Sequence, residues 1–596
     1  MKITKLTAAL LVAGFAFGAQ AATYQPGTYT EKVNGHNAAF TVKVTVSKNK
    51  IEKIEYPDNL ETIGVGRVAL DTLSKKIIDR QSLGVDNVTG ATISSFALKG
   101  AVKKALEQAK VSKADMAALQ KNSEKYTALP DEIKTQVVIV GGGSGLAAAI
   151  AAQQAGAKVI VLEKLGLLGG STNVSEGALN AADPERQGKQ GIEDSIQKHY
   201  EQTMKGGHDI GTPELVHYLT ENALPTLHWM ESLGVKFKPE VGTATGALWQ
   251  RSHYPVTPSG NSYIRVYQKY IADHAKDMTV YTDMTVESLI KDKNGRIIGV
   301  TAKDGHTGKV TKFMASNGVV VATGGFGANV ALRQKVNTGV FKDYDLGKGI
   351  GCTNFSKSAQ GAGIEMGEKV GANVIGMSDI QVHPCGTPGT GLMEMVRTSG
   401  RNRVFINEQG NRFVNEGAAR DVLAKAIFAQ PHSTYYVLVN HLRYPSLDWV
   451  DANGAKMKDM IDLGRVVSAP TLDELAKKLN MPVENLKKSI ADYNAVVEGK
   501  AKDALGFQAN NKADKVMTEG PWYACKKVPT VHHTMGGLQI NTKAQVLDKN
   551  GKVIPGLYAA GETTGGIHGS NRLGGNAIAD IMVFGRTAGT NAAQNK

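Results

Sequence analysis

The sequence predicts an α/β protein preceded by a small α+β domain. Residues 135–163 read as a buried strand, a glycine-rich turn, an alanine-rich helix and a second strand, while residues 24–60 alternate as a hairpin does. The chain has 596 residues, of which 42% are hydrophobic. This length allows about three or four domains, each with its own core.

The N-terminal residues have the organisation of a secretory signal peptide. Lys2 and Lys5 precede an apolar stretch over residues 6–17, and the small residues at 19–21 suit a cleavage site. The alternative, a transmembrane anchor, needs a run of roughly 20 apolar residues, which is longer than this one. We therefore expect residues 1–21 to be removed and the mature protein to be exported, most simply into a bacterial periplasm.

Cysteine usage and charge exclude several classes of protein. Cys352, Cys385 and Cys525 are too widely spaced for a disulfide framework or a zinc site, and the Cys-x-x-Cys-His sequence of a c-type haem is absent. The net charge of +14 could attract anions. Lysines and arginines are scattered along the chain, however, so a solvated basic surface is the simpler interpretation. No nucleic-acid-binding module is recognisable.

The predicted N-terminal domain covers residues 22–110. Its expected elements are a hairpin with three valines on one face (Val42, Val44 and Val46), a helix over 66–80 and a helix over 94–109. A polar stretch over residues 111–132 is predicted to be the linker to the rest of the chain.

The strand, turn and helix at 135–163 are typical of dinucleotide binding. Glycines let the backbone approach a pyrophosphate, the helix N-terminus favours its negative charge, and Glu163 suits ribose hydroxyls. The third glycine of the usual Gly-x-Gly-x-x-Gly pattern arrives one residue early, at Gly145. This indicates a tighter turn or a phosphate held differently.

Two later stretches complete the same domain. Residues 318–329 read as a buried strand entering a glycine turn, and residues 556–589 as a strand, an Ala-Gly-Glu turn, a glycine-rich loop and a helix. Two-dinucleotide-binding flavoproteins bring such an Ala-Gly-Glu turn to the ribityl chain of the flavin. We therefore predict a Rossmann-like FAD-binding domain in two parts, 133–377 and 532–596, with a capping domain inserted over 378–531.

The residues predicted to bind FAD lie in these turns. They are Gly141, Gly143, Ser144, Gly145, Glu163, Lys164, Gly170, Ser171, Thr323, Gly324, Gly325, Gly561, Glu562, Asn576, Ala577 and Ile578. The loop after the second strand contains no histidine for covalent attachment, so FAD is expected to be held non-covalently.

Five motifs after residue 132 are specific: "MKGGHDIGTPELV", "VATGGFGAN", "RFVNEGAARD", "VHHTMGG" and "GIHGSNRLGGNA". With them the chain resembles the flavoprotein subunit of the fumarate reductase and succinate dehydrogenase family. The resemblance is greatest to the soluble exported branch, which includes flavocytochrome c fumarate reductases and urocanate reductases. It implies reduction of a C=C bond conjugated to a carboxylate, serving as an anaerobic respiratory electron sink.

The stretch "DNVTGAT", residues 86–92, matches the flavinylation motif Asp-x-x-(Ser/Thr)-Gly-Ala-Thr, and the residues before 110 resemble an FMN-binding domain. In that family the last threonine, here Thr92, carries FMN through a phosphoester bond. Gly90 and Ala91 leave room for a phosphate, and the following helix presents its N-terminal amides. The alternative is a plain threonine-rich helix cap.

The resemblance also implies catalytic roles. FAD N5 would donate the hydride, with electrons arriving from FMN on Thr92. Arg420 matches the acid of the family, while Glu394 and Arg397 match its proton path and would share one helix face. Because the pKa of a guanidinium is usually above about 12, Arg420 serves as an acid only if the transition state is carbanion-like.

The implied substrate site departs from the fumarate pattern. Arg572 and His532 match the carboxylate-binding pair, although His533 could exchange roles with His532, and His383 matches the histidine at the far carboxylate. The threonine of fumarate-specific enzymes is Met393 here, and methionine offers no hydrogen-bond donor. We expect an unsaturated acid with a less polar or aromatic β-substituent, such as a urocanate-like, cinnamate-like, acrylate-like or methacrylate-like molecule.

Several points stay open at this stage. An imidazole substituent would need an acidic or phenolic partner, for which Glu176 and Tyr254 are candidates. The alternatives to a 2-enoate reductase are a fumarate reductase, an electron-transfer flavoprotein and a dehydrogenase working in the oxidative direction. The expected partners are the acid itself, an exported or membrane-anchored donor such as a c-type cytochrome or a quinol dehydrogenase, and a flavin transferase.

Overall fold

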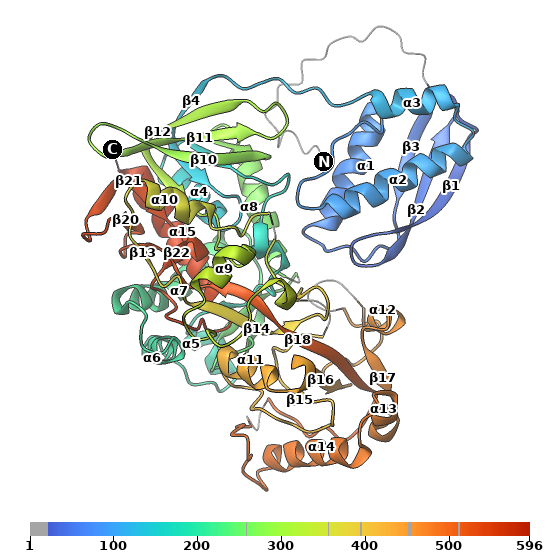
Figure 1. The fold of residues 1–596 in the computed structure, drawn as a ribbon, viewed down its shortest axis with the longest axis vertical. Coiled ribbons are helices and arrows are strands. Elements are labelled where there is room, and N and C mark those ends of the chain that lie inside the picture. The colour runs from blue at the N-terminus through green and yellow to red at the C-terminus, as the bar shows by residue number, and fades with distance from the viewer. Residues whose placement is uncertain are drawn as a thin grey trace.

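The computed structural model describes residues 22–257, 259–355, 357–393, 396–450, 456–509 and 513–595. The predicted signal peptide, residues 1–21, and the predicted relay residue Glu394 lie outside these ranges. The chain forms an N-terminal domain, a dinucleotide-binding domain and a capping domain, which are coloured blue, cyan to green with red, and yellow to orange in Figure 1.

The N-terminal domain is a three-stranded antiparallel sheet covered by helices (Figure 1). Its elements are β1 (Gly27–Asn34), β2 (Ala39–Ser47), β3 (Lys50–Glu55), α1 (Gly66–Arg80), α2 (Thr92–Gln108) and α3 (Lys113–Lys121). The predicted alternation is confirmed, because Val42, Val44 and Val46 all lie in the core with at most 3% of their surface exposed.

Helix α3 changes the predicted boundary between this domain and its linker. Helix α3 lies within the stretch predicted to be the linker, and its Met116 and Leu119 are buried in the core of the N-terminal domain. Ser112 caps the helix by accepting a hydrogen bond from the amide of Asp115. A stretch without helix or strand begins only at residue 122.

The dinucleotide-binding domain is built on an eight-stranded sheet. Its strands are β4 (Glu132–Val140), β5 (Val159–Leu162), β9 (Met278–Tyr281), β10 (Met284–Lys291), β11 (Ile297–Asp304), β12 (Val310–Val321), β20 (Gln545–Leu547) and β21 (Val553–Ala559). The order is β10-β11-β12-β4-β5-β9, and β21 joins β12 and β20. Strands β9, β5, β4, β12 and β21 are parallel, so their carboxyl ends share one edge. Ligands bind at this edge in open α/β sheets.

Helices cover this sheet and complete its core. They are α4 (Gly145–Gln154), α5 (Pro184–Lys189), α6 (Ile196–Gly206), α7 (Pro213–Ser232), α8 (Asn261–Asp273), α9 (Val330–Val336), α10 (Ala362–Lys369) and α15 (Asn576–Gln594). Short elements lie between them: β6 (Leu179–Asn180), β7 (Phe237–Gly242), β8 (Ser252–Pro255), β13 (Val374–Ile375), β19 (Gly537–Gln539), β22 (Thr564–Gly565), and the 3-10 turns η1 (Gly170–Val174), η2 (Lys348–Ile350) and η4 (Gly561–Thr563). The residues of α4 and α15 pack into one buried cluster with the parallel strands.

The capping domain has an antiparallel sheet of its own. Its elements are β14 (Ile380–Gly386), β15 (Val404–Ile406), β16 (Tyr435–Asn440), β17 (Val467–Ala469), β18 (Trp522–Thr534), α11 (Arg420–Phe428), η3 (Pro431–Ser433), α12 (Met457–Asp462), α13 (Leu472–Lys478) and α14 (Val483–Val497). The long strand β18 runs from the capping sheet back to the dinucleotide-binding domain (Figure 1). It therefore delivers the histidines at its end to the boundary between the two domains.

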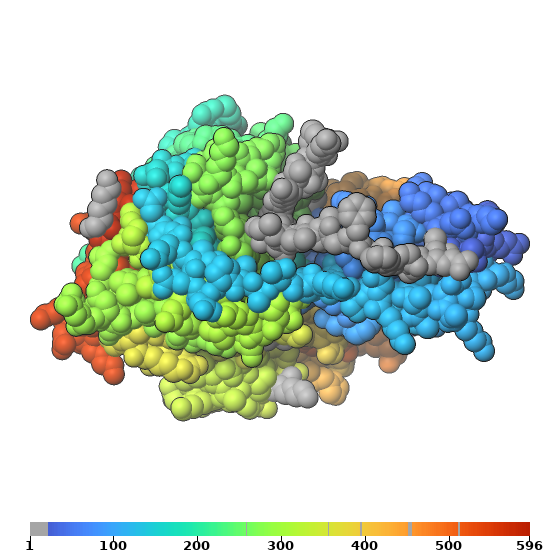
Figure 2. All heavy atoms as spheres, turned by 90° about the horizontal axis from the view of Figure 1, so that it is seen from above, coloured from blue at the N-terminus to red at the C-terminus, as the bar shows by residue number. Residues whose placement is uncertain are grey.

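The N-terminal domain lies beside the dinucleotide-binding domain and above α12 of the capping domain (Figure 1). Seen from above, it occupies one end of the molecule, with the connecting chain running across to the central domain (Figure 2). No helix among the described residues has both the length and the apolar character needed to cross a bilayer.

Candidate active site

A cavity of about 730 Å³ opens where the three domains meet. Thr92 contributes to it from the N-terminal domain, Ser171 and Arg572 from the dinucleotide-binding domain, Met393 from the inserted segment and His532 from the end of β18. Volumes of this size are typical of sites for small molecules and cofactors. Five residues predicted separately from the sequence therefore face one space.

A narrower groove of about 150 Å³ continues this cavity towards the glycine turn. Among its walls are Gly141, Gly143, Ser144, Glu163, Lys164, Gly170, Thr323 and Gly324. The groove and the main cavity share Ser171, Thr172, Asn354, Glu562 and Ile581. Together they form one continuous trench along the carboxyl edge of the parallel sheet, which is where a long dinucleotide fits.

Close backbone packing explains why glycine is required at two positions of the glycine-rich turn. Gly141 has a φ of +109°, and a Cβ there would lie 2.2 Å from the carbonyl oxygen of Ala322. A Cβ on Gly145 would lie 2.7 Å from Cγ2 of Ile139, on the strand against which α4 packs. Close packing of helix on strand is the usual role of the third glycine in this turn. The early glycine thus keeps that role in a turn shortened by one residue.

Two buried carboxylates border the trench. Glu163 accepts hydrogen bonds from the amides of Gly142 and Leu165, both at 2.7 Å, and burial raises its pKa to about 6. Glu562 accepts from the amide of Thr534 at 2.9 Å, and burial raises its pKa to about 7. Each oxygen retains a lone pair, so these carboxylates can still accept hydrogen bonds from ligand hydroxyls.

The other predicted FAD residues lie around the same trench. A Cβ on Gly325 would lie 2.1 Å from Oγ1 of Thr534, and Gly561 has a φ of +73°, so glycine is needed at both. Ala577 and Ile578 line the main cavity at the start of α15. The side chain of Asn576 is instead engaged by Asn180, His199 and Thr203. Its backbone amide donates to the carbonyl oxygen of Leu573 at 3.2 Å, so Asn576 orders the start of α15.

Arg420 begins helix α11 and is 5% exposed. Its Nε donates to the carbonyl oxygen of Thr245 and its Nη1 to Oε1 of Gln381, both at 2.8 Å. Burial, followed by the nearby guanidinium of Arg572, lowers the pKa of Arg420 well below its usual value of 12.5. This brings the guanidinium closer to the range in which a proton can be given up.

Gln381 is a site residue that the sequence interpretation missed. Its Oε1 accepts from Arg420, and its Nε2 donates to the carbonyl oxygen of Arg572 at 2.7 Å and to Oδ1 of Asn571 at 3.2 Å. The side-chain amide of Gln381 thereby links the guanidinium of Arg420 to the backbone of Arg572. Because Gln381 precedes His383 by two positions in β14, strand alternation could have placed it on the same face.

The histidines form a second group beside the arginines. The rings of His383 and His532 lie 4.7 Å apart, and His532 contacts Oγ1 of Thr353 at 2.8 Å. Nδ1 of His383 accepts from the amide of Cys385 at 3.0 Å, so a neutral His383 carries its proton on Nε2. Burial lowers the pKa of both histidines well below 6.5, and Arg420 contributes to each shift. Both are therefore neutral near pH 7.

His532 and His533 have separate surroundings. His533 faces His568 edge-on at 5.6 Å, and His568 contacts Oδ2 of Asp580 at 3.0 Å. His532 is the one that lies against His383. Both histidines line the main cavity, and they differ in the neighbours that their rings contact.

Arg397 lies behind this group, with Nε 3.7 Å from Oε1 of Glu176. The same carboxylate oxygen accepts from Oγ of Ser399 at 2.8 Å. Burial, with the Glu176 carboxylate nearby, raises the pKa of Tyr254, so this phenol stays protonated. Glu176 and Tyr254 thus lie near one another, as an acceptor and a donor.

Thr92 is the first residue of α2, and its N-cap is Ala91, which makes no side-chain capping bond. The simple helix-cap interpretation is therefore wrong. Gly90 has a φ of +101°, a conformation that favours glycine. The hydroxyl-bearing side chain of Thr92 lines the main cavity at the N-terminus of the helix. Residues 90–92 therefore fit a phosphate attached at this point.

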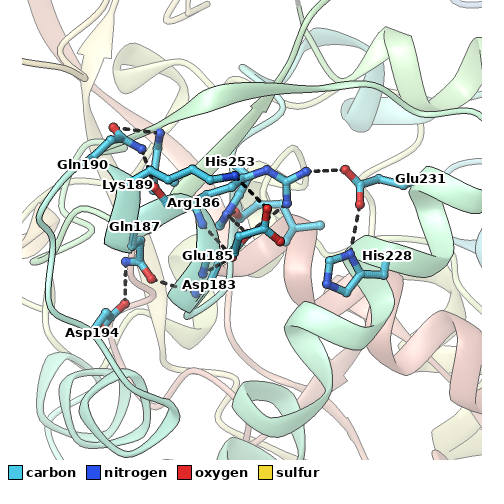
Figure 3. A network of polar contacts seen from close by, with 12 residues as sticks. Asp183, Glu185, Arg186, Gln187, Lys189, Gln190, Asp194, His228, Glu231 and His253 are labelled. Atoms are coloured by element: carbon cyan, nitrogen blue, oxygen red, sulfur yellow. Dashed lines mark hydrogen bonds and ion pairs between the residues drawn. The ribbon is translucent and has the colours of Figure 1, made fainter.

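A further polar network includes His253 of strand β8 (Figure 3). Asp183 accepts from Nη1 of Arg186 at 2.9 Å and contacts Nε2 of His253 at 3.2 Å. Arg186 also pairs with Glu231. These side chains pair with one another, and none of them lines the two cavities described above.

Comparison with known proteins identifies both domains. A model of the FAD binding domain matches residues 136–578, and a model of the FMN-binding domain matches residues 35–107. The trench fits FAD by its glycine turn, and residues 90–92 fit FMN. The predicted cofactors, FAD and FMN, are therefore confirmed.

Named relatives span most of the chain. An NADH:acrylate oxidoreductase of Vibrio harveyi is 34% identical over 96% of this chain, and the chain spans 61% of that protein, less than two thirds of its length. A urocanate reductase of Eggerthella lenta is 35% identical over 95% of this chain and 92% of its own. The open conformation of a flavocytochrome c3 fumarate reductase matches 78% of this chain and 79% of its own, with 35% identity and a TM-score of 0.60. The chain therefore belongs to the flavoprotein oxidoreductase family of the fumarate, urocanate and acrylate reductases, and the predicted α/β fold with an FMN-binding domain is confirmed.

Proposed function

We propose that this protein reduces the C=C bond of an α,β-unsaturated carboxylate. The observation that carries the proposal is a pair of buried guanidinium groups, Arg420 and Arg572. Among the described residues, no carboxylate lies within 4 Å of either one. Buried charges are normally paired, so two such groups in one site indicate an anionic ligand.

The carboxylate clamp consists of Arg572 and His532. Nε of Arg572 is buried and has no hydrogen-bond partner among the described residues, while its Nη1 donates to the carbonyl oxygen of Leu573 at 3.0 Å. A planar guanidinium matches a carboxylate with parallel hydrogen bonds. If the hydroxyl of Thr353 donates to Nδ1 of His532, its Nε2 carries the proton and can donate to the same carboxylate.

Arg420 donates the proton to the alkene in this proposal. Its position is fixed by Thr245 and Gln381, and its lowered pKa makes loss of a proton less costly. Arg397 and Glu394 restore the proton from solvent. When bound, FAD supplies the hydride at N5 and FMN supplies the electrons. The two arginines therefore take different tasks: Arg572 holds the substrate and Arg420 protonates it.

Met393 and the pair Glu176 and Tyr254 support a substrate other than fumarate. Met393 lines the cavity where fumarate-specific enzymes place a donor, and a carboxylate deprived of one donor loses about 1–3 kcal/mol. The relatives include enzymes named for acrylate and urocanate, and Glu176 with Tyr254 offers an acceptor and a donor for a polar ring. The alternative is fumarate, with His383 alone at the far carboxylate.

We further propose that FMN is attached covalently to Thr92 by a flavin transferase. Donors in the periplasm, such as a c-type cytochrome or a quinol dehydrogenase, deliver electrons to it. The Thr92 side chain lines the same cavity as Arg572 and His532, which supports a short route between the two flavins. An electron-transfer flavoprotein without substrate would not need the arginine pair, so a reductase is the better supported class.

One anaerobic assay tests the proposal. Reduced viologen dye is oxidised by the holoenzyme in the presence of fumarate, urocanate, cinnamates, acrylate or methacrylate in turn. We expect turnover with at least one non-fumarate acid and weaker turnover with fumarate. Turnover with none of these acids would refute the proposal, and preference for fumarate would support the alternative.

A second assay concerns Thr92. Thr92→Ala should remove the covalent flavin, seen as a loss of FMN mass from the intact chain. A protein donor should then no longer drive the reaction, because its electrons enter through FMN. Ser94→Ala is the matched control, since Ser94 is buried on the same helix turn and should leave the flavin attached. An FMN adduct that persists in Thr92→Ala would rule out this site.

A further inference from the structure

The segment that carries Thr92 is pressed against the dinucleotide-binding domain. The carbonyl oxygen of Thr89 accepts from the amide of Gly166 at 3.1 Å. A Cβ on Gly90 would lie 3.4 Å from Cδ1 of Leu165 and 3.6 Å from Cδ2 of Leu167. Leu167 is 4% exposed and packs into the core of the N-terminal domain. Residues 165–167 therefore pack against Thr89 and Gly90 of the flavinylation motif.

A clasp of charged and aromatic side chains holds the first residue of this motif. His306, in the turn between β11 and β12, has Nδ1 3.4 Å from Oδ2 of Asp86 and Nε2 3.4 Å from Oδ2 of Asp283. Its ring stacks on Tyr126 at 3.9 Å. Oε2 of Glu124 accepts from the amide of Asp86 at 2.9 Å. Asp86 is thus held by the linker and by the central domain.

Two more contacts show how closely the domains approach. Gly64 of the N-terminal domain is buried, and a Cβ there would lie 2.8 Å from Oδ1 of Asn173 on η1. Nη2 of Arg465, from the capping domain, donates to the carbonyl oxygen of Asn37 at 2.6 Å. All three domains therefore take part in the docked arrangement.

We propose that residues 86–92 form a shared docking face that binds either the central domain or a flavin transferase, but not both at once. This inference rests on the proposed attachment of FMN at Thr92. A specific contact between two proteins buries roughly 800 Å² on each partner. Val88 and Ala91 are buried and Thr89 and Gly90 are half-buried, so little surface around Thr92 is left for a second protein to make a contact of this size.

The attachment reaction itself needs this access. The Oγ1 of Thr92 forms a bond to the flavin-side phosphorus of a donor FAD, the pyrophosphate bond breaks, AMP leaves, and the hydroxyl proton passes to the transferase. Both FAD and the enzyme must reach the hydroxyl from outside. The N-terminal domain is therefore modified while undocked and docks afterwards.

The linker permits this movement. Residues 122–130 have no helix or strand and are mostly exposed. Nine extended residues reach up to roughly 30 Å. The domain can consequently leave the docking face without unfolding any element.

The test measures flavin attachment to the full-length chain. Protein made without a transferase is incubated with a purified flavin transferase and FAD, and the gain of FMN mass is followed with peptide mapping to Thr92. His306→Ala removes the clasp, and Gly166→Val forces a side chain where even a Cβ would lie 3.0 Å from the amide nitrogen of Thr89. Each should accelerate attachment about five-fold or more, because loss of one such contact shifts a docking equilibrium by roughly that factor.

Two matched controls act away from the face. His274→Ala removes a histidine that also stacks on a tyrosine, Tyr270, at 4.0 Å, and Gly188→Val adds a side chain where a Cβ would meet nothing within 4 Å. Both should match the wild type. Hydrogen exchange over residues 86–92 should rise only in the two docking variants, which gives a readout independent of the transferase.

The outcomes separate the two levels of the proposal. If FMN reaches Thr92 at equal rates in the wild type and both docking variants, the shared face is refuted while attachment at Thr92 stands. If FMN reaches Thr92 in none of the chains, covalent attachment itself is refuted. Since the two docking variants alter different contacts, misfolding of one leaves the other to decide.

Discussion

Two groups of buried charges in this protein are built in opposite ways. Under β8, Arg251 is 0% exposed and pairs with Asp194 through two hydrogen bonds, from Nε at 2.9 Å and from Nη2 at 2.7 Å. In the candidate active site, Arg420 and Arg572 are 5% and 3% exposed, and they bond to carbonyl and amide oxygens and to no described carboxylate. The arginines of the two groups are therefore buried to a similar extent, but only Arg251 is paired with a carboxylate.

The difference separates structural charges from binding charges. A buried guanidinium without a counter-ion raises the energy of the folded protein, and an anionic ligand lowers it again. The network of Figure 3 needs no ligand because Asp183 and Glu231 already balance Arg186. Substitutions in the two groups should therefore affect different quantities.

The largest effect is expected from Arg420→Ala. Loss of a positioned acid lowers kcat by roughly 10²–10⁴-fold, while FAD should stay bound because the guanidinium of Arg420 is hydrogen-bonded to Thr245 and Gln381 and not to a residue predicted to bind FAD. Steady-state rates with reduced dye and flavin absorbance give the two readouts. Arg186→Ala is the control from the paired network, with kcat expected within about two-fold of wild type. Retained activity in Arg420→Ala would remove its role as the acid.

Arg572→Lys should come next. Lysine keeps the charge but loses the planar fork, so substrate affinity should fall by about ten- to hundred-fold, mainly as a higher KM. Arg251→Lys is the matched exchange in the paired group and should lower stability while leaving KM unchanged. The comparison is measured as KM and as the urea midpoint for each variant. An equal rise in KM in both would mean that Arg572 does not bind the substrate directly.

Asp183→Asn should test the paired network through its pH dependence. Burial alone would raise the pKa of Asp183, but hydrogen bonds from His253 and Arg186 hold it below the usual 3.8. A carboxylate that is more acidic when folded stabilises the protein above its unfolded pKa, and this stabilisation is lost as pH falls towards the folded pKa. Asp183→Asn should therefore lower the free energy of unfolding at pH 7 by about 2 kcal/mol, and the difference from wild type should shrink below about pH 4.

Urea unfolding at several pH values measures this change. Asp273→Asn, in an exposed pair with Lys269, is the control and should change stability by less than about 0.5 kcal/mol. A stability difference for Asp183→Asn that is constant from pH 7 to pH 3 would contradict the assignment of Asp183 as an ionised, paired group.

Local patterns in the sequence predicted the parts of the molecule that depend on local geometry. The alternation of Val42, Val44 and Val46 predicted the buried face of the first sheet, and the glycine turn predicted the position of the dinucleotide trench. The hydrogen bonds of the Arg420 guanidinium could not be predicted from the sequence. A backbone carbonyl such as that of Thr245 accepts hydrogen bonds whatever side chain the residue carries. The insertion of Leu167 into the N-terminal core was missed for a related reason: a leucine in an apolar loop does not reveal which domain it packs against.

The smallest effect is expected from Met393→Thr, which sharpens the comparison within the site. Threonine adds a hydroxyl at the end of the cavity that faces the β-substituent, so a second carboxylate there gains a hydrogen bond worth about 1 kcal/mol. The ratio of kcat/KM for fumarate to that for the preferred acid should rise about five-fold. Met393→Leu keeps the apolar volume and should leave the ratio near that of wild type. An unchanged ratio in Met393→Thr would show that another wall of the cavity reads the β-substituent.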